Sequence, residues 1–156
     1  MTAAMPVLGT AERVAELFAE RLAGRVLAYS GVAQKDQPAA QIRLASANVR
    51  LRALRMLIDD VVGEIESRAA TGDPISRTVR ANARLAAAHT VHDSRSIIAG
   101  LMEAAGASAH FLDNPMQRAK RDVDIVSGHV VFDYDTSREL AGALVTGAKI
   151  SPIAMV

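Results

Sequence analysis

Apolar side chains recur every three or four residues along most of the chain, and no alternating run is long enough to build a sheet. Thr10 is a suitable N-cap, so a first helix is expected over 11–26, with Gly24 near its end. Tyr29-Ser30-Gly31 and the residues before Pro38 then predict a connecting loop.

The second helix is expected from Pro38 to about residue 70, because only Gly63 interrupts this stretch. Its apolar residues form two neighbouring stripes. One stripe consists of Ile42, Ala45, Val49, Leu57, Val61 and Ile65, and the other of Leu44, Leu51, Leu54, Ile58 and Val62. So wide an apolar surface predicts a central helix that contacts several neighbours. Gly72 suits the position just past the end of this helix.

Three more helices are expected in the second half of the chain. Asp73-Pro74 serves as N-cap and first residue of a helix that runs to about residue 105, and 104–110 breaks the period as a turn or loop. Asn114-Pro115 begins a fourth helix that runs to about residue 131. A short fifth helix ends near Gly147, and Asp133, Asp135 and Ser137 are its candidate caps.

This order of elements predicts an all-α fold, namely an up-and-down four-helix bundle with a short extra C-terminal helix. The expected boundaries are an N-terminal arm over 1–9, the helical bundle over 10–148 and a C-terminal tail over 149–156. A length of 156 residues suits one domain, and 50% hydrophobic with 22% charged residues is typical of a folded protein.

Charge and cysteine content exclude several classes of function. The chain carries 18 Lys and Arg against 17 Asp and Glu, so we expect no nucleic-acid partner. No apolar run is long enough for a membrane span, and the first residues do not form a secretory signal. The absence of Cys excludes disulfides and thiol catalysis and suits a reducing compartment, so we expect a cytoplasmic location.

General chemical motifs are missing from the sequence. No Glu-x-x-His pair suits a di-iron bundle, and neither common glycine-rich nucleotide fingerprint occurs. His89 and His92 lie three residues apart, but no third ligand has a suitable spacing, so we expect no metal. The many arginines of 43–95 are interpreted as a solvated face paired with nearby acidic residues.

One segment, 117–129, is chemically richer. Arg118 and Asp122 are spaced i, i+4 and can form an ion pair, with Arg121 beside them. His129 lies seven residues after Asp122 and would return to the same helical face. Two roles remain open for His129: a core histidine bonded to a backbone carbonyl, or a side chain presented to a cavity at the end of the bundle.

Four segments in order resemble the C-terminal helical domain of the acyl-CoA dehydrogenase superfamily, and they are most similar to its two-component flavin-dependent monooxygenases. The resemblance covers 7–147. The segments are Gly24-Arg25 with Tyr29-Ser30-Gly31; 38–45; 104–109; and 114–118 with Arg121-Asp122 and His129. True dehydrogenases of this superfamily often carry Tyr-Glu-Gly-Thr after the Arg-Asp pair. This chain has Ser127-Gly128-His129 instead, which disfavours dehydrogenation.

The resemblance implies roles for individual residues. It places Arg25 near the flavin phosphates of a neighbouring subunit, where a guanidinium suits phosphate oxygens. It places the turn at Gly106, Ala107 and Ser108 near flavin as well, and adds Arg118 to the cofactor-binding residues. Arg121 and Asp122 would form a structural ion pair that braces this loop. His129 would be catalytic, beside the isoalloxazine, where it helps to stabilise a C4a-peroxyflavin.

The implied function is that of a helical domain or split subunit of a flavin-dependent monooxygenase that hydroxylates a small organic, aromatic substrate. Reduced FMN or FAD would come from a separate flavin reductase. The chain would form a homodimer or homotetramer, and a partner chain would supply the N-terminal and β domains that the family carries. The alternatives are a stand-alone oligomerisation or interaction module without catalysis and an acyl-CoA dehydrogenase-type oxidoreductase.

Overall fold

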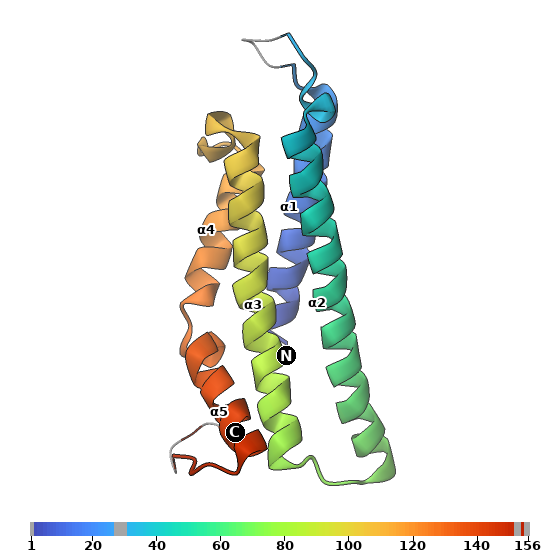
Figure 1. The fold of residues 1–156 in the computed structure, drawn as a ribbon, viewed down its shortest axis with the longest axis vertical. Helices are drawn as coiled ribbons and strands as arrows, with labels where there is room; N and C mark the ends of the chain where they lie inside the picture. Colours follow the sequence, from blue (N-terminus) through green and yellow to red (C-terminus); the bar gives the residue numbers. More distant parts are fainter. Residues whose placement is uncertain (1, 27–30, 152–153, 155–156) are drawn as a thin grey trace.

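The computed structural model describes residues 2–26, 31–151 and 154, and these residues form five α-helices and no strand (Figure 1). The α-helices are α1 (Ala4–Gly24), α2 (Pro38–Thr71), α3 (Arg77–Ala105), α4 (Pro115–Ser127) and α5 (Tyr134–Thr146). Three short 3₁₀ helices are η1 (Gln34–Asp36), η2 (Ala107–His110) and η3 (Val130–Phe132). The predicted all-α class is therefore confirmed.

The bundle is arranged around α3, which contacts each of the other four α-helices. In Figure 1, α1 and α3 run upward, while α2 and α4 run downward. α5 continues the direction of α4 along the lower half of α3, so two short helices form the fourth column. The expected up-and-down bundle with an extra C-terminal helix is thus the observed architecture.

Aliphatic and small side chains fill the core between α1, α2, α3 and α4. The largest fully buried apolar side chains are Leu8, Val14, Phe18, Ile58, Val91, Ile98, Leu101 and Met102. Alanines of α3, among them Ala87 and Ala105, are also buried in this cluster and allow the helices to approach closely. This packing fixes the end of α1 beside the end of α3, where the expected cofactor residues lie.

The first helix begins earlier than the sequence pattern predicted. It starts at Ala4 rather than at residue 11, so residues 4–9 form its first turns instead of belonging to an arm. Thr10 is not the N-cap, because its hydroxyl donates within the helix to the carbonyl of Pro6 at 2.8 Å. Val7 and Leu8 are buried, and Pro6 lies in the first turn, where no backbone N–H is needed.

The boundary between α2 and α3 is partly as predicted. Gly72 ends α2 with a φ of +73°, a left-handed conformation that favours glycine. The expected cap at Asp73-Pro74 is wrong, because the Asp73 N–H closes α2 by donating to the carbonyl of Arg68 at 2.9 Å. Ser76 caps α3 instead, and its hydroxyl oxygen accepts from the N–H of Val79 at 3.2 Å.

The caps of α4 and α5 follow the sequence prediction, but the end of α4 does not. Asn114 caps α4 and Asp133 caps α5 through side-chain oxygens. α4 ends at Ser127 rather than near residue 131, which changes the position of His129. Within the described residues, none of the helices combines the length and apolarity that crossing a membrane requires.

Candidate functional site

Arg21 of α1 and Arg25, which directly follows α1, bind the C-terminal end of α3. The carbonyl oxygen of Ala105 accepts from Arg21 Nε at 3.2 Å, Arg21 Nη2 at 3.0 Å and Arg25 Nη1 at 2.7 Å. A helix C-terminus carries unsatisfied carbonyls and the equivalent of about half a negative charge. The two guanidinium groups carry more positive charge than the helix end carries negative charge. The site therefore keeps a net positive charge, which suits an anion.

The two guanidinium groups also affect each other. Burial lowers the pKa of Arg21, and the neighbouring charge of Arg25 lowers it further. Arg21 Nη2 additionally donates to the hydroxyl of Ser108 at 2.5 Å. Arg21 therefore holds the loop in place, whereas Nη1 is the one nitrogen of Arg25 that hydrogen-bonds to another described residue.

Gly106 makes the turn between α3 and η2. Its φ of +78° and ψ of 179° belong to a region that other residues rarely adopt. A Cβ added there would stand 3.7 Å from Arg25 Nη1, which is ordinary van der Waals contact, so the positive φ rather than a lack of space favours glycine. Ala107 and Ser108 begin η2, and the carbonyl of Ser108 accepts from Asn114 Nδ2 at 3.1 Å. The cap of α4 thus braces the turn.

A hollow of about 360 Å³ opens beside this cluster. Its lining residues are Arg25, Gln34, Gln37, Ala39, Ala40, Arg43, Glu103, Ala104, Ala105 and Gly106. Gln34 is buried, and its Nε2 donates to the carbonyl of Ala104 at 3.3 Å, while its Oε1 accepts no hydrogen bond from the described residues. Guanidinium donors and a spare amide acceptor suit a ligand that carries both an anionic group and hydroxyls.

Arg118, Arg121 and Asp122 lie on the exposed surface of α4. Arg118 Nε is 3.7 Å from one carboxylate oxygen of Asp122, and Arg121 Nε is 3.6 Å from the other. The side chain of Arg118 is 78% exposed, and exposed ion pairs of this kind contribute about 0–1 kcal/mol. Among the described residues, neither guanidinium group forms a hydrogen bond with the loop over 106–114 that the resemblance expected them to brace; the Arg118 backbone N–H donates to the carbonyl of Asn114 at 3.4 Å.

His129 lies outside α4, so the expected return to the helical face of Asp122 is wrong. α4 stops because Gly128 and His129 turn back onto the carbonyls of Ile125 and Val126. His129 is exposed and caps η3, with Nδ1 accepting from the N–H of Val131 at 3.2 Å. This arrangement fixes the proton of a neutral imidazole on Nε2.

The fold brings together only part of the expected site. Arg25, Gly106 and Ser108 meet at one end of α3. Arg118 follows them in α4 but points to solvent, and His129 lies beyond the other end of that helix. Thirteen residues of α4 place His129 about 20 Å along the bundle from the Arg25 cluster. Tyr29 and Ser30, which belong to the resembling segments, lie outside the described residues.

Sequence reasoning missed Arg21 and Gln34 as residues of this site, and it missed one contact of Asn114. Arg21 lies one helical turn before Arg25, and that i, i+4 spacing was a signal that could have identified it. Gln34 is buried at the start of the three-residue helix η1, which is too short for periodicity to mark it. Asn114 was recognised as a cap, but its second contact, to Ser108, links residues that helical spacing does not relate.

A separate aromatic cluster joins α3 to α5. His89 Nδ1 lies 3.0 Å from the hydroxyl of Tyr134, and the His92 ring stacks on the Tyr134 ring at 4.5 Å. The guanidinium of Arg138 lies 4.5 Å from the centroid of the same ring. The described residues contain no group of three or more acidic or histidine side chains placed to hold a metal ion. Through Tyr134, both histidines of α3 contact α5.

The family described as "Acyl-CoA dehydrogenase, C-terminal domain" matches residues 1–134. The oxygenase component of p-hydroxyphenylacetate 3-hydroxylase from Acinetobacter baumannii is 28% identical over 145 residues, which cover 93% of this chain and 34% of that protein. The oxygenase subunit HsaA of a flavin-dependent monooxygenase from Mycobacterium tuberculosis is 32% identical over 143 residues, covering 90% of this chain and 36% of that protein.

Solved structures agree with this relationship. The crystal structure of the HsaA monooxygenase from M. tuberculosis superposes with a TM-score of 0.85 at 28% identity, covering 99% of this chain and 39% of that one. XiaF from Streptomyces sp., in complex with FADH2 and glycerol, has the same fold, with a TM-score of 0.89 at 22% identity over 98% of this chain and 38% of that one.

The chain spans about a third of the length of the relatives it matches. The part of each solved chain that superposes on this one shares its all-α bundle. With a match over most of its residues, the chain belongs to the family of acyl-CoA dehydrogenase C-terminal domains.

Proposed function

We propose that this chain is the helical domain, or a split subunit, of a flavin-dependent monooxygenase that hydroxylates a small aromatic substrate. A separate reductase would supply its reduced FMN or FAD. The similar oxygenase components and subunits support this proposal, as does the FADH2 bound by XiaF. The observation that carries the proposal is the cluster of Arg25, Gly106 and Ser108. The resemblance assigned these residues to flavin binding although they come from separate parts of the sequence.

The residues present fit a flavin at this end of the bundle. Arg25 and Arg43 would hold its phosphate oxygens, while Gln34 would accept a hydrogen bond from a hydroxyl of its side chain. Gly106 makes the turn directly after the carbonyl that Arg25 binds. When bound, reduced flavin supplies the electrons that activate oxygen for hydroxylation.

His129 would act at a different place in the assembly. With Nδ1 engaged by the N–H of Val131, Nε2 is the atom that can hold or deliver a proton beside the reacting group. The separation of His129 from Arg25 along α4 supports a flavin shared between copies, with Arg25 of one copy at the phosphates and His129 of another at the ring. A homodimer or homotetramer is therefore part of the proposal, together with a chain that supplies the remaining domains.

A chimaera tests this function. Residues 4–147 replace the matched region of the M. tuberculosis oxygenase subunit, which is then given reduced flavin by a reductase. The chimaera is expected to form the hydroxylated product of the parent subunit. The H129Q chimaera is expected still to oxidise reduced flavin. It should form at least about tenfold less hydroxylated product than the unsubstituted chimaera, because the substitution removes the group that transfers the proton.

H92Q is the matched control, since His92 lies on α3 and contacts Tyr134 instead of the proposed site. Circular dichroism confirms that each chimaera is folded. A folded chimaera that binds no reduced flavin, or equal product from H129Q and the unsubstituted chimaera, would contradict the proposed function.

A second candidate is an oligomerisation module without catalysis. It is favoured by the outer face of α2, which is apolar but contacts no other helix of the described chain. Self-association without flavin binding by the chimaera would support this alternative.

A further inference from the structure

The carbonyl oxygen of Ala105, a buried residue, receives more hydrogen bonds than it has lone pairs. Arg21 donates to it through Nε at 3.2 Å and Nη2 at 3.0 Å, and Arg25 donates through Nη1 at 2.7 Å. A backbone carbonyl oxygen has two lone pairs. The two bonds from Arg21 therefore satisfy this oxygen by themselves, and the bond from Arg25 can be given up without leaving a buried acceptor unpaired.

The two arginines are anchored differently. Arg21 lies inside α1, and its Nη2 also donates to the hydroxyl of Ser108 at 2.5 Å, so its bonds hold the end of α3 and the turn after it. Arg25 follows the last residue of α1, and Nη1 is its one side-chain nitrogen that bonds another described residue. Among the described residues, Arg25 lines the hollow of about 360 Å³ and Arg21 does not. Arg25 is therefore the arginine placed to turn toward a ligand.

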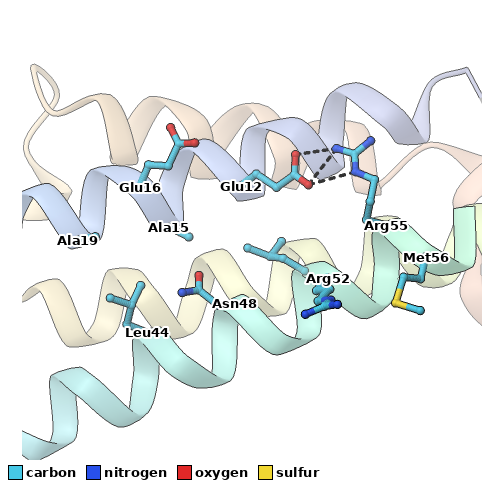
Figure 2. Close-up of a pocket in the computed structure, with 10 residues that line it drawn as sticks. Glu12, Ala15, Glu16, Ala19, Leu44, Asn48, Arg52, Arg55 and Met56 are labelled. Carbon is cyan, nitrogen blue, oxygen red and sulfur yellow. Dashed lines mark hydrogen bonds and ion pairs between the residues drawn. The ribbon is translucent and has the colours of Figure 1, made fainter. Parts of the chain in front are cut away.

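The acceptors of these two guanidinium groups within the described residues are a carbonyl and a hydroxyl, and no carboxylate is one of them. Elsewhere an arginine that links two helices meets an acidic side chain, as Arg55 of α2 does when it reaches Glu12 of α1 at 2.7 Å across a groove (Figure 2). Burial lowers the pKa of Arg21, and the close charge of Arg25 lowers it further. Repulsion between the two charges thus favours a move of Arg25 toward an anion.

We infer that Arg21 is a positioning residue that allows Arg25 to exchange the Ala105 carbonyl for the phosphate of a ligand. Before the ligand binds, both arginines hold the carbonyl. When the phosphate enters the hollow, Arg25 Nη1 leaves Ala105 and donates to a phosphate oxygen, because a hydrogen bond to an anion is about twice as strong as one to a neutral acceptor. Arg21 keeps the carbonyl satisfied and the turn in place. The inference rests on the proposed function for the identity of the ligand, a flavin that carries a phosphate.

Removal of the Arg21 side chain would leave Arg25 as the one arginine that satisfies Ala105. Transfer of Arg25 to a phosphate would then leave a buried carbonyl unpaired, and this cost would reduce what the phosphate contributes to binding. A residue that only stabilises the fold would act differently, since its loss would weaken binding of ligands with and without a phosphate alike. The two roles therefore differ in the ratio of the affinities for reduced FMN and reduced riboflavin.

The chimaera that carries residues 4–147 tests this ratio. R21M keeps an aliphatic side chain but no donor, and it is expected to lower the ratio of the affinity for reduced FMN to that for reduced riboflavin at least about threefold. R21K keeps the charge without the forked donors and is expected to restore only part of this loss. R13M is the matched control, because Arg13 lies on α1 and bonds Glu16 and Glu20 on the surface.

Two results in folded chimaeras would overturn the inference while the proposed function stands. One is an R21M ratio equal to that of the unsubstituted chimaera. The other is an R21K ratio equal to it, because charge alone would then explain the effect of Arg21. Equal affinity of the unsubstituted chimaera for the two flavins would contradict the proposed function, and the inference with it.

Nuclear magnetic resonance of the unsubstituted chain tests the exchange without a substitution that could impair folding. With arginine labelled at Nε, inorganic phosphate is expected to shift the Nε–H signal of Arg25. The Nε–H signal of Arg21 is expected to stay slow to exchange with solvent, because it remains bonded to Ala105. Sodium chloride at equal ionic strength is the control for screening. Loss of slow exchange at Arg21, or no shift at Arg25, would overturn the inference.

Discussion

At the scale of single residues, the site depends on three groups meeting at one carbonyl. Arg21 and Arg25 donate to the carbonyl of Ala105, and Gly106 turns the chain directly after it. The resemblance of the sequence to the family predicted that Arg25 and Gly106 both lie at the cofactor site. Helical spacing alone could not show that α1 ends beside α3, because that contact depends on the packing of the whole core.

The backbone of Gly106 gives a direct test of this arrangement. G106A is expected to destabilise the protein by about 1–3 kcal/mol, because alanine is strained at this positive φ. G100A is the control: Gly100 lies inside α3 with nothing within 4 Å of an added Cβ, so alanine there is expected to stabilise by about 0.5–1 kcal/mol. Urea unfolding measures both, and a G106A protein as stable as the unsubstituted chain would contradict the assigned backbone role.

At the scale of elements, the sequence predicted where most helices start and where several stop. Gly72 and Asn114 act as expected, since a left-handed glycine and a capping amide are local devices. The end of α4 was missed because Val126, Val130 and Val131 continue an apolar pattern past Gly128. Whether such a pattern continues a helix depends on tertiary contacts, here the burial of Phe132.

The junction of α3 and α4 is held by a bridging carboxylate. Asp124 of α4 accepts from Arg95 of α3 at 2.8 Å and from Lys120 at 2.5 Å. Burial works against ionisation of Asp124, but these hydrogen bonds outweigh it and hold the pKa of the carboxyl below its ordinary value of 3.8. Because the pKa of Asp124 is lowered on folding, its ionised form stabilises the folded protein at pH values above the ordinary pKa. This stabilisation is lost as the pH falls through the lowered pKa.

D124N is therefore expected to lose about 1 kcal/mol of stability at neutral pH. Its stability should also fall less steeply than that of the unsubstituted chain below about pH 4. D122N is the control on the same helix, because the Asp122 carboxylate is 53% exposed and its ion pairs are longer. Thermal unfolding measured at a series of pH values gives the stability of each variant. If the stability of D124N and that of the unsubstituted chain fall equally with decreasing pH, the role of the bridge is refuted.

At the scale of the whole molecule, the fold separates the proposed phosphate end from His129 by the length of α4. The architecture was predictable because helical periodicity and the family resemblance agree over nearly the whole chain. The position of His129 was not, because the end of α4 at Ser127 depends on tertiary contacts that helical spacing does not reveal.

The central claim is that the Arg25 end of the bundle binds the phosphate of reduced flavin. The most direct measurement compares the affinity of the folded chimaera for reduced FMN with its affinity for reduced riboflavin, which lacks the phosphate. Reduced FMN is expected to bind at least about tenfold more tightly, and R25Q to remove most of that difference, since a charge-assisted contact contributes about 1.5–3 kcal/mol. R68Q, at the opposite end of α2, should leave the preference intact. Equal affinity for the two flavins, or a preference that R25Q preserves, would contradict the account.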